Sequence, residues 1–130
     1  MKKTYFCPHC NAVLNPNEKV IFIVDDGERK GLILLSAKPG DYRLIADQNF
    51  ILEKGRAATF SCPVCTRSLT SAVNDKFAEI KLDQGAPTLS TVEFSRVFGE
   101  HATFIIDGRE MASYGEDADD MEDVNFFGSI

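Results

Sequence analysis

The chain carries four cysteines, which form two Cys-x-x-Cys pairs with none left over. The pairs are Cys7 with Cys10 and Cys62 with Cys65. Cysteine can ligate a metal, form a disulfide or act as a redox nucleophile, and in a reducing compartment such pairs favour metal over disulfides. Two pairs supply the four sulfur ligands of a tetrahedral zinc site, with each sulfur about 2.3 Å from the metal. The spacing therefore predicts one structural zinc ion, with iron as the second choice of metal.

Both pairs lie in one longer frame, Cys-Pro-x-Cys-x-x-x-Leu. Residues 7–14 read Cys-Pro-His-Cys-Asn-Ala-Val-Leu and residues 62–69 read Cys-Pro-Val-Cys-Thr-Arg-Ser-Leu. An aromatic residue precedes each pair within two positions, namely Phe6 and Phe60, and an apolar strand candidate follows each, at 19–24 and 76–82. Proline fixes φ inside a tight turn, where its missing N–H costs little. The frame indicates two hairpin knuckles that face each other across one metal.

This repeat resembles the paired knuckles of the zinc-ribbon, or rubredoxin-like, superfamily. The resemblance covers residues 5–14 and 60–69 with the strands that follow, and it implies a metal site without implying a particular function. Many members have glycine after the second cysteine, where φ is positive, but this chain has Asn11 and Thr66. Because a β-branched residue adopts positive φ poorly, we expect the second knuckle to turn differently from the first.

The 51 residues that separate Cys10 from Cys62 are too many for a compact four-cysteine site, so we expect them to hold an inserted sheet. Apolar runs bounded by turn residues predict strands at 20–24, 32–35, 42–46, 50–52 and 57–60. The first two runs are continuously apolar, which predicts strands covered on both faces, and residues 31–36 also fit a helix. Asp25 to Glu28 has the composition of a hairpin turn.

Three further strands are predicted after the second knuckle, at 92–98, 102–106 and 109–114, with Arg96 interrupting the apolar alternation of the first. Asp107-Gly108 is a hairpin turn signal between the last two. We expect these strands to form a meander that packs against the ribbon sheet. The predicted fold is therefore all-β or nearly so, a zinc ribbon with a long inserted β-sheet between the knuckles and a C-terminal β-meander.

Charge divides the chain into two parts. Residues 1–90 hold twelve Lys or Arg against ten acids, whereas residues 91–130 hold two against ten, and the formal net charge is −6. We expect a single domain over 1–114, with a candidate sub-boundary near 83–90, and an acidic, flexible tail over 115–130. The tail ends in an apolar segment that could dock into a groove of a partner or fold back on its own sheet. Its apolar residues are Val124, Phe126, Phe127 and Ile130.

These features predict a small, non-enzymatic zinc-binding protein that acts as a protein-interaction or regulatory module. No signal-peptide or membrane-spanning run is present in the sequence, so we expect it in the cytoplasm. An enzymatic alternative starts from Cys7-Pro8-His9-Cys10, which is identical to the active-site tetrapeptide of periplasmic disulfide oxidoreductases. Their thioredoxin fold needs a helix that begins at the motif, whereas Asn15-Pro16-Asn17 would end such a helix after one turn.

Two other functions stay open from the sequence. A nucleic-acid-binding ribbon could use a basic face with Tyr42 and Phe50 as stacking platforms, although the net charge disfavours it. The residues of that face are Arg29, Lys30, Lys38, Arg43, Lys54 and Arg56. A redox-sensitive zinc switch that releases its metal on oxidation is the second alternative. His9 and His101 could be a fifth ligand or a second site, but we expect them to be exposed loop residues.

Overall fold

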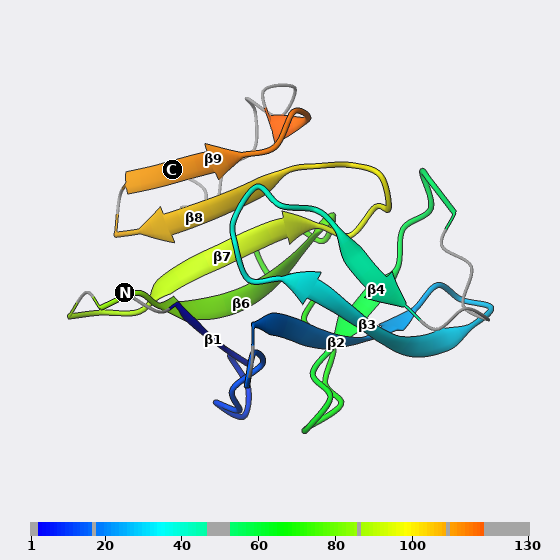
Figure 1. Cartoon of the computed structure of the whole chain (residues 1–130), viewed down its shortest axis with the longest axis horizontal. Coiled ribbons are helices and arrows are strands. Elements are labelled where there is room, and N and C mark those ends of the chain that lie inside the picture. Colours follow the sequence, from blue (N-terminus) through cyan, green and yellow to red (C-terminus); the bar gives the residue numbers. More distant parts are fainter. Residues whose placement is uncertain (1–2, 17, 47–52, 86, 109, 119–130) are drawn as a thin grey trace.

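The computed structural model describes residues 3–16, 18–46, 53–85, 87–108 and 110–118. These residues form nine strands in two antiparallel sheets, with no α-helix in the described part of the chain (Figure 1). The predicted all-β class is therefore confirmed. Within the same ranges, no helix is long and apolar enough to cross a membrane.

One sheet has five strands in the order β1-β6-β7-β8-β9, and the other has four in the order β4-β3-β2-β5. The strands of the first are β1 (Thr4–Phe6), β6 (Phe77–Asp83), β7 (Ser90–Ser95), β8 (Thr103–Asp107) and β9 (Glu110–Tyr114). Those of the second are β2 (Lys19–Asp25), β3 (Lys30–Ser36), β4 (Leu44–Ala46) and β5 (Thr59–Ser61). The four-stranded sheet is the predicted insertion between the knuckles. The strand predicted at 50–52 lies outside the described residues.

The C-terminal meander is confirmed, but its relation to the rest of the fold differs from the prediction. Strands β7, β8 and β9 are consecutive neighbours, and β7 also pairs with β6 from Phe77↔Ser95 to Leu82↔Ser90. The meander therefore extends the sheet that contains β1 and β6 instead of packing on it as a separate layer. The candidate sub-boundary near 83–90 lies at the connection between the paired strands β6 and β7.

Strands β2 and β3 pair along seven residues each, which assigns residues 31–36 to a strand and not to a helix. Their alternation sends one set of side chains inward, including Phe22 and Ile33, which are 1% and 0% exposed. The prediction that both faces are covered is wrong. The opposite face of this sheet is apolar and partly open to solvent, with Leu32 52% and Ile45 56% exposed. Ladder hydrogen bonding and one buried face are enough to hold these strands.

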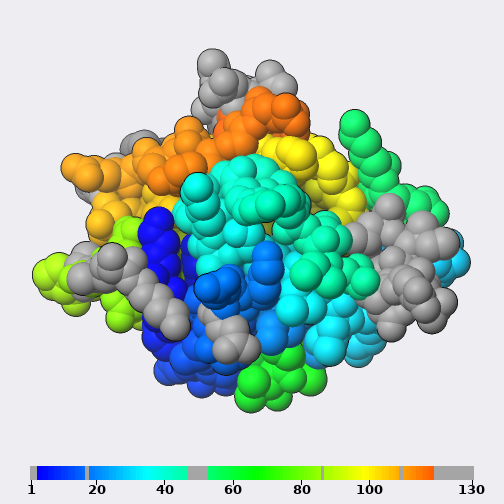
Figure 2. Space-filling model, in the orientation of Figure 1, coloured from blue at the N-terminus to red at the C-terminus, as the bar shows by residue number. Residues whose placement is uncertain are grey.

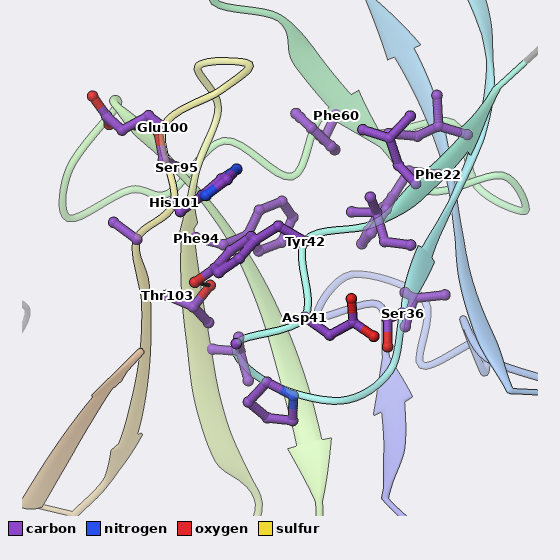
Figure 3. A pocket seen from close by; sticks show the side chains of 18 of the residues that line it. Phe22, Ser36, Asp41, Tyr42, Phe60, Phe94, Ser95, Glu100, His101 and Thr103 are labelled. Carbon is purple, nitrogen blue, oxygen red and sulfur yellow. Dashed lines mark hydrogen bonds between the residues drawn. The ribbon is translucent and has the colours of Figure 1, made fainter. Parts of the chain in front are cut away.

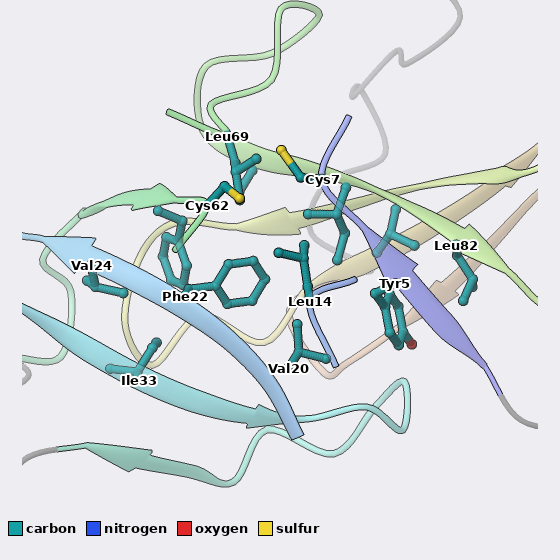
Figure 4. Close-up of a cluster of buried hydrophobic side chains, with 14 of the residues drawn as sticks. Tyr5, Cys7, Leu14, Val20, Phe22, Val24, Ile33, Cys62, Leu69 and Leu82 are labelled. Atoms are coloured by element: carbon teal, nitrogen blue, oxygen red, sulfur yellow. The ribbon is translucent and has the colours of Figure 1, made fainter. Parts of the chain in front are cut away.

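The main core lies between the two sheets (Figure 4), and it includes phenylalanines from both. Phe22 of β2 lies 5.5 Å, ring centre to ring centre, from both Phe60 and Phe94, and Phe60 lies 5.2 Å from Phe94. The Phe22–Phe60 and Phe60–Phe94 pairs are edge-to-face, which is a favoured arrangement of aromatic rings. Because Phe94 belongs to the five-stranded sheet, these contacts join the two layers.

Arg96 follows β7 and explains why the apolar alternation stops there. Its guanidinium donates to the carbonyl oxygens of Ala58 at 3.1 Å and Asp75 at 3.0 Å. Its backbone N–H donates to the Lys76 carbonyl, and its own carbonyl accepts from Ala58 N–H. One side chain thus links the segments that lead into β5 and β6, which belong to different sheets.

Candidate metal centre

The two knuckles occupy the two places where the chain crosses between the sheets. The first, Cys7 to Cys10, follows β1 of the five-stranded sheet and leads toward β2 of the four-stranded sheet. The second, Cys62 to Cys65, follows β5 and leads back to β6. The strands after the two knuckles therefore lie in different layers. A metal held by both knuckles would tie the layers together at their crossing points.

Local hydrogen bonds shape the first knuckle. The Cys7 N–H donates to the Ala12 carbonyl at 3.0 Å, and the Asn11 N–H donates to the Cys7 carbonyl at 2.9 Å. The His9 N–H points at the Cys7 Sγ, 3.3 Å away. Leu14, the last residue of the frame, is 1% exposed, and its N–H donates to the Tyr5 carbonyl. The leucine of the repeat thus anchors its knuckle in the core.

The second knuckle repeats the first, so the expectation that it turns differently is wrong. Cys62 N–H donates to the Arg67 carbonyl, Thr66 N–H donates to the Cys62 carbonyl, and Leu69 N–H donates to the Phe60 carbonyl. Thr66 has φ of 64° and Asn11 has φ of 62°. The β-branched residue therefore adopts the left-handed conformation, because the hydrogen bonds on both sides and the anchored leucine over-determine the turn.

The four sulfur atoms converge on one point between the knuckles. Cys7 Sγ lies 3.7 Å from Cys65 Sγ, Cys10 Sγ lies 3.7 Å from Cys62 Sγ, and all four sulfurs lie within 4.8 Å of one another. A tetrahedron with metal–sulfur bonds of 2.3 Å has sulfur–sulfur edges of about 3.8 Å. The four cysteines are thus positioned to bind one metal ion.

Burial and hydrogen bonding act differently on the thiols of Cys7, Cys62 and Cys65. Burial raises the pKa of Cys7 to about 12 and also raises the pKa of Cys62, whose side chains are buried. The pKa of Cys65 is lowered, chiefly by a hydrogen bond from the Arg67 N–H. Backbone N–H groups of Val64 and Cys65 also point at the Cys62 sulfur, at 3.3 and 3.4 Å. These N–H groups can stabilise thiolates once a metal supplies positive charge.

His9 connects the two knuckles without being a ligand. Its Nε2 donates to the Ser68 carbonyl, 3.0 Å away in the second knuckle. The residue is exposed, as expected for a loop position, but the prediction of a plain loop residue missed this bridge. Since the Ser68 carbonyl can only accept, the hydrogen bond places a proton on Nε2.

The predicted basic face is divided between the two ends of β3. Arg29 and Lys30 lie at the β2–β3 hairpin, whereas Lys38 and Arg43 lie beyond the other end of the strand, about 20 Å along the backbone. The Arg43 guanidinium pairs with Asp41 at 2.7 Å. Arg56 pairs with Glu28 at 3.3 Å and Glu53 at 3.8 Å. Two of the three arginines of the predicted face are therefore held in ion pairs with carboxylates.

The remaining predicted site residues that the structure describes do not form one site with the cysteines. Tyr42 is half-buried and stacks on His101, which covers one face of its ring, and Phe50 lies outside the described residues. His101 is bonded to Glu116 through Nδ1 and to the Asp117 carboxylate through its backbone N–H. The predicted docking residues of the tail, Val124, Phe126, Phe127 and Ile130, lie outside the described residues. The hairpin turn predicted at Asp25 to Glu28 joins β2 to β3, and in it Asp26 Oδ1 accepts from the N–H groups of Glu28 and Arg29.

Comparisons with family models, with curated proteins and with solved structures find no match to this chain.

Sequence reasoning also missed a buried carboxylate, Glu93 of β7. Glu93 is 1% exposed, and neither of its carboxylate oxygens has a hydrogen-bond partner in the described part of the chain. Burial, with Glu79 opposite it on β6, raises its pKa to about 8. The apolar alternation of residues 92–98 places Glu93 on the face opposite Val92 and Phe94, and nothing in the sequence indicates that this face is buried as well.

Proposed function

We propose that the four cysteines bind one structural zinc ion and that the protein is a zinc-ribbon-like binding module without enzymatic activity. The observation that carries the zinc proposal is the sulfur geometry, in which four thiols from two equivalent knuckles match a tetrahedron. Four sulfur ligands leave no coordination position for a reacting water. The buried Cys7 with its raised pKa is also unlike the exposed, acidic thiol that redox catalysis needs.

The metal proposal is tested by loading and spectroscopy. Protein purified without added chelator should contain one zinc per chain by elemental analysis, and cobalt exchange should produce the charge-transfer and ligand-field bands of tetrahedral thiolate coordination. Cys10→Ser should weaken metal affinity, whereas Ser61→Ala, beside Cys62 but without a thiol, should leave it unchanged. Stoichiometric iron with the same four ligands would replace zinc in the proposal, and no bound metal at all would overturn it.

The protein-binding part of the proposal rests on the outward side of the four-stranded sheet. We call this surface the apolar outer face, and its residues are Ile21, Ile23, Leu32, Leu34 and Ile45. Ile21, Leu34 and Ile45 are directly opposite one another on β2, β3 and β4, so they form a continuous row. A row of large aliphatic side chains on a solvent-facing sheet is typical of a surface that another protein covers.

We propose that a different protein, and not a second copy of this chain, covers the apolar outer face. A double substitution on this face tests the proposal. Leu32→Ser with Ile45→Ser should abolish cross-linking of a specific partner to zinc-loaded protein while leaving the melting temperature near that of wild type. Leu89→Ser is the matched control, because Leu89 is 50% exposed but lies in the β6–β7 connection. Retention of the same partner by the double variant would contradict the proposal. A wild-type dimer that the double variant turns into a monomer would assign the face to self-association instead.

A redox-sensitive zinc switch is a second candidate, and the unequal burial of the ligands favours it. Cys10 is exposed and Cys65 is partly exposed, whereas Cys7 and Cys62 are 0% exposed. An oxidant can therefore reach one sulfur of each knuckle. Zinc release in dilute peroxide, followed with a chromogenic chelator, should be reversed by a thiol reductant. Release no faster than from ordinary four-thiolate sites would remove this candidate.

A further inference from the structure

A cavity of about 150 Å³ lies between the two sheets, at the end away from the β2–β3 hairpin. The loop that joins β3 to β4 closes one side of it, and the β7–β8 connection closes another (Figure 3). In the space-filling view the β3–β4 loop lies in the middle of the visible face, next to the residues of β8 and β9 (Figure 2). The cavity is separate from the cysteine centre, since none of the four cysteines lines it.

The inner wall of the cavity is apolar and largely aromatic. Phe22, Phe60 and Phe98 are buried side chains of the wall, whereas Phe94, near the end of β7, the central strand of its sheet, is only partly buried. A central strand residue between two packed sheets is normally closed off by the facing sheet, so the open surface of Phe94 marks space that the chain itself does not fill. An apolar cavity of about this volume holds a benzene-sized ring.

The mouth of the cavity carries polar groups that are held rigidly. The rings of Tyr42 and His101 stack at 4.4 Å with an angle of 7° between their planes. The Tyr42 hydroxyl donates to the Tyr114 carbonyl and is bonded to the Thr103 hydroxyl at 2.9 Å. Gly115 is required here, because a Cβ would overlap the His101 carbonyl and lie 2.6 Å from the Tyr42 hydroxyl. The position of the His101 ring is therefore built into the fold.

The hydrogen bonds of His101 define what its ring can offer to a ligand. The Nδ1 atom lies 3.2 Å from the Glu116 carboxylate, which can only accept, so Nδ1 carries a proton. In the neutral ring this makes Nε2 an acceptor, and Nε2 has no hydrogen-bond partner in the described part of the chain. Figure 3 shows the His101 ring projecting from the β7–β8 connection beside Tyr42, and both residues line the cavity.

We propose that this cavity binds a small aromatic ring that carries one hydrogen-bond donor, of the size of indole or phenol. The ring fills the space against Phe94 and the other wall phenylalanines, and its N–H or O–H donates to the free Nε2 of His101. The proposal is independent of the metal assignment, since it uses none of the cysteines.

Indole itself is a suitable probe, because the chain contains no tryptophan and indole can be excited without protein background. Titration of indole with the intact, metal-loaded protein should shift its emission to the blue, with a Kd on the order of 0.1–1 mM for a ligand of this size. The matched ligand 1-methylindole has the same ring but no donor. It should bind about tenfold more weakly, which is the contribution of one hydrogen bond. Equal affinities for the two compounds, or no binding of indole, would overturn the proposal.

The variant His101→Phe keeps a flat ring for stacking on Tyr42 but removes the acceptor. It should lose about tenfold in indole affinity, the value of one hydrogen bond, and should bind 1-methylindole as wild type does. A wild-type amide NMR spectrum recorded during the indole titration gives a readout that does not depend on the variant folding. Shifts should concentrate at residues 38–44 and 94–103, and shifts confined to the apolar outer face would contradict the proposed site.

The same ring chemistry could come from a free compound or from a partner protein's tryptophan. N-acetyl-tryptophanamide distinguishes the two sources. Binding as tight as that of indole would mean that the mouth admits a peptide side chain, and binding of indole alone would assign the cavity to a free small molecule. Either result supports recognition of a donor-bearing aromatic ring.

Discussion

At the residue scale, the two knuckles show how one motif tolerates different residues at the same backbone position. Asn11 and Thr66 both have φ near +60°, a conformation that asparagine adopts readily and threonine does not. The neighbouring hydrogen bonds are equivalent in the two turns. Thr66 therefore carries strain that Asn11 does not, and this difference can be measured.

Thr66→Gly should stabilise the protein by about 1 kcal/mol, because glycine adopts positive φ without a Cβ clash, although it loses more chain entropy on folding. Asn11→Gly should give a smaller gain, since asparagine is already tolerant of this conformation. The free energies of unfolding should be compared in urea with metal at saturation. A loss of stability in Thr66→Gly would mean that the hydroxyl contact from Thr66 to the Cys65 carbonyl, at 2.6 Å, outweighs the strain.

Glu93 gives a prediction about pH. Its pKa is raised from 4.5 to about 8 in the folded protein, so the folded state holds a proton that the unfolded chain has lost across that range. The contribution of Glu93 to stability therefore falls as pH rises from about 4.5 to 8, by up to about 1.4 kcal/mol per pH unit. The charged groups near it are Glu79 and Lys81 of β6, which pair with each other at 3.7 Å.

Glu93→Gln should flatten this pH dependence and should be more stable than wild type above about pH 8, where the wild-type carboxylate is charged and buried. Unfolding free energies should be measured only above about pH 6.5, because proton competition for the thiolates would add its own pH dependence at lower values. Parallel curves for the variant and wild type would show that Glu93 does not titrate in this range.

At the scale of elements, the end of strand β7 is where apolar packing between the sheets gives way to hydrogen bonding by a charged side chain. Phe94 packs between the sheets, whereas Arg96 uses its guanidinium to hold the carbonyls of Ala58 and Asp75. The segments that lead into β5 and β6 are thereby joined. The charged residue that interrupts the apolar alternation of this strand links two layers.

Arg96→Met should lower the free energy of unfolding by about 1–3 kcal/mol, because two backbone carbonyls lose a charged donor. Arg43→Met is the control, since the Arg43 side chain is 86% exposed and its pair with Asp41 should contribute little. Urea denaturation of both variants with metal present provides the comparison. Equal effects of the two substitutions would mean that the Arg96 contacts are not structural.

At the scale of the whole molecule, the cysteine centre and the phenylalanine core hold the same two sheets together from different positions. The four cysteines lie at the crossing points of the chain, where a bound metal would join them, and Phe22, Phe60 and Phe94 join the facing strands. The short strands β1 and β5 lie at sheet edges, directly before the knuckles. Their position should depend most on the metal.

Removing the metal with a chelator should therefore lower the melting temperature and release β1 and β5 first, since structural zinc contributes about 10 kcal/mol or more to small metal-dependent folds. Thermal melts followed by far-UV circular dichroism should be compared for loaded and chelated protein, and amide hydrogen exchange should locate the released strands. Re-addition of zinc should restore the original melt. An unchanged melting temperature after complete metal removal would contradict a structural role.

By itself, the amino-acid sequence determined the features that depend on local spacing. The pairing of Cys7 with Cys10 and Cys62 with Cys65, the shared leucine of the two frames and most strands follow from patterns a few residues long, because turns and strand alternation are local. The positive φ of Thr66 could not be predicted, since the surrounding hydrogen bonds override its intrinsic preference.

Only the tertiary structure decided which surfaces meet. It places the strands after the two knuckles in different sheets, buries Glu93, and brings Tyr42 and His101 into a stack at the mouth of a cavity. It also leaves one side of β2 and β3 open, where the sequence predicted cover on both. Each of these results depends on contacts between residues far apart in the chain, and strand order is set by the packing of two whole sheets. Sequence patterns a few residues long therefore do not predict that packing.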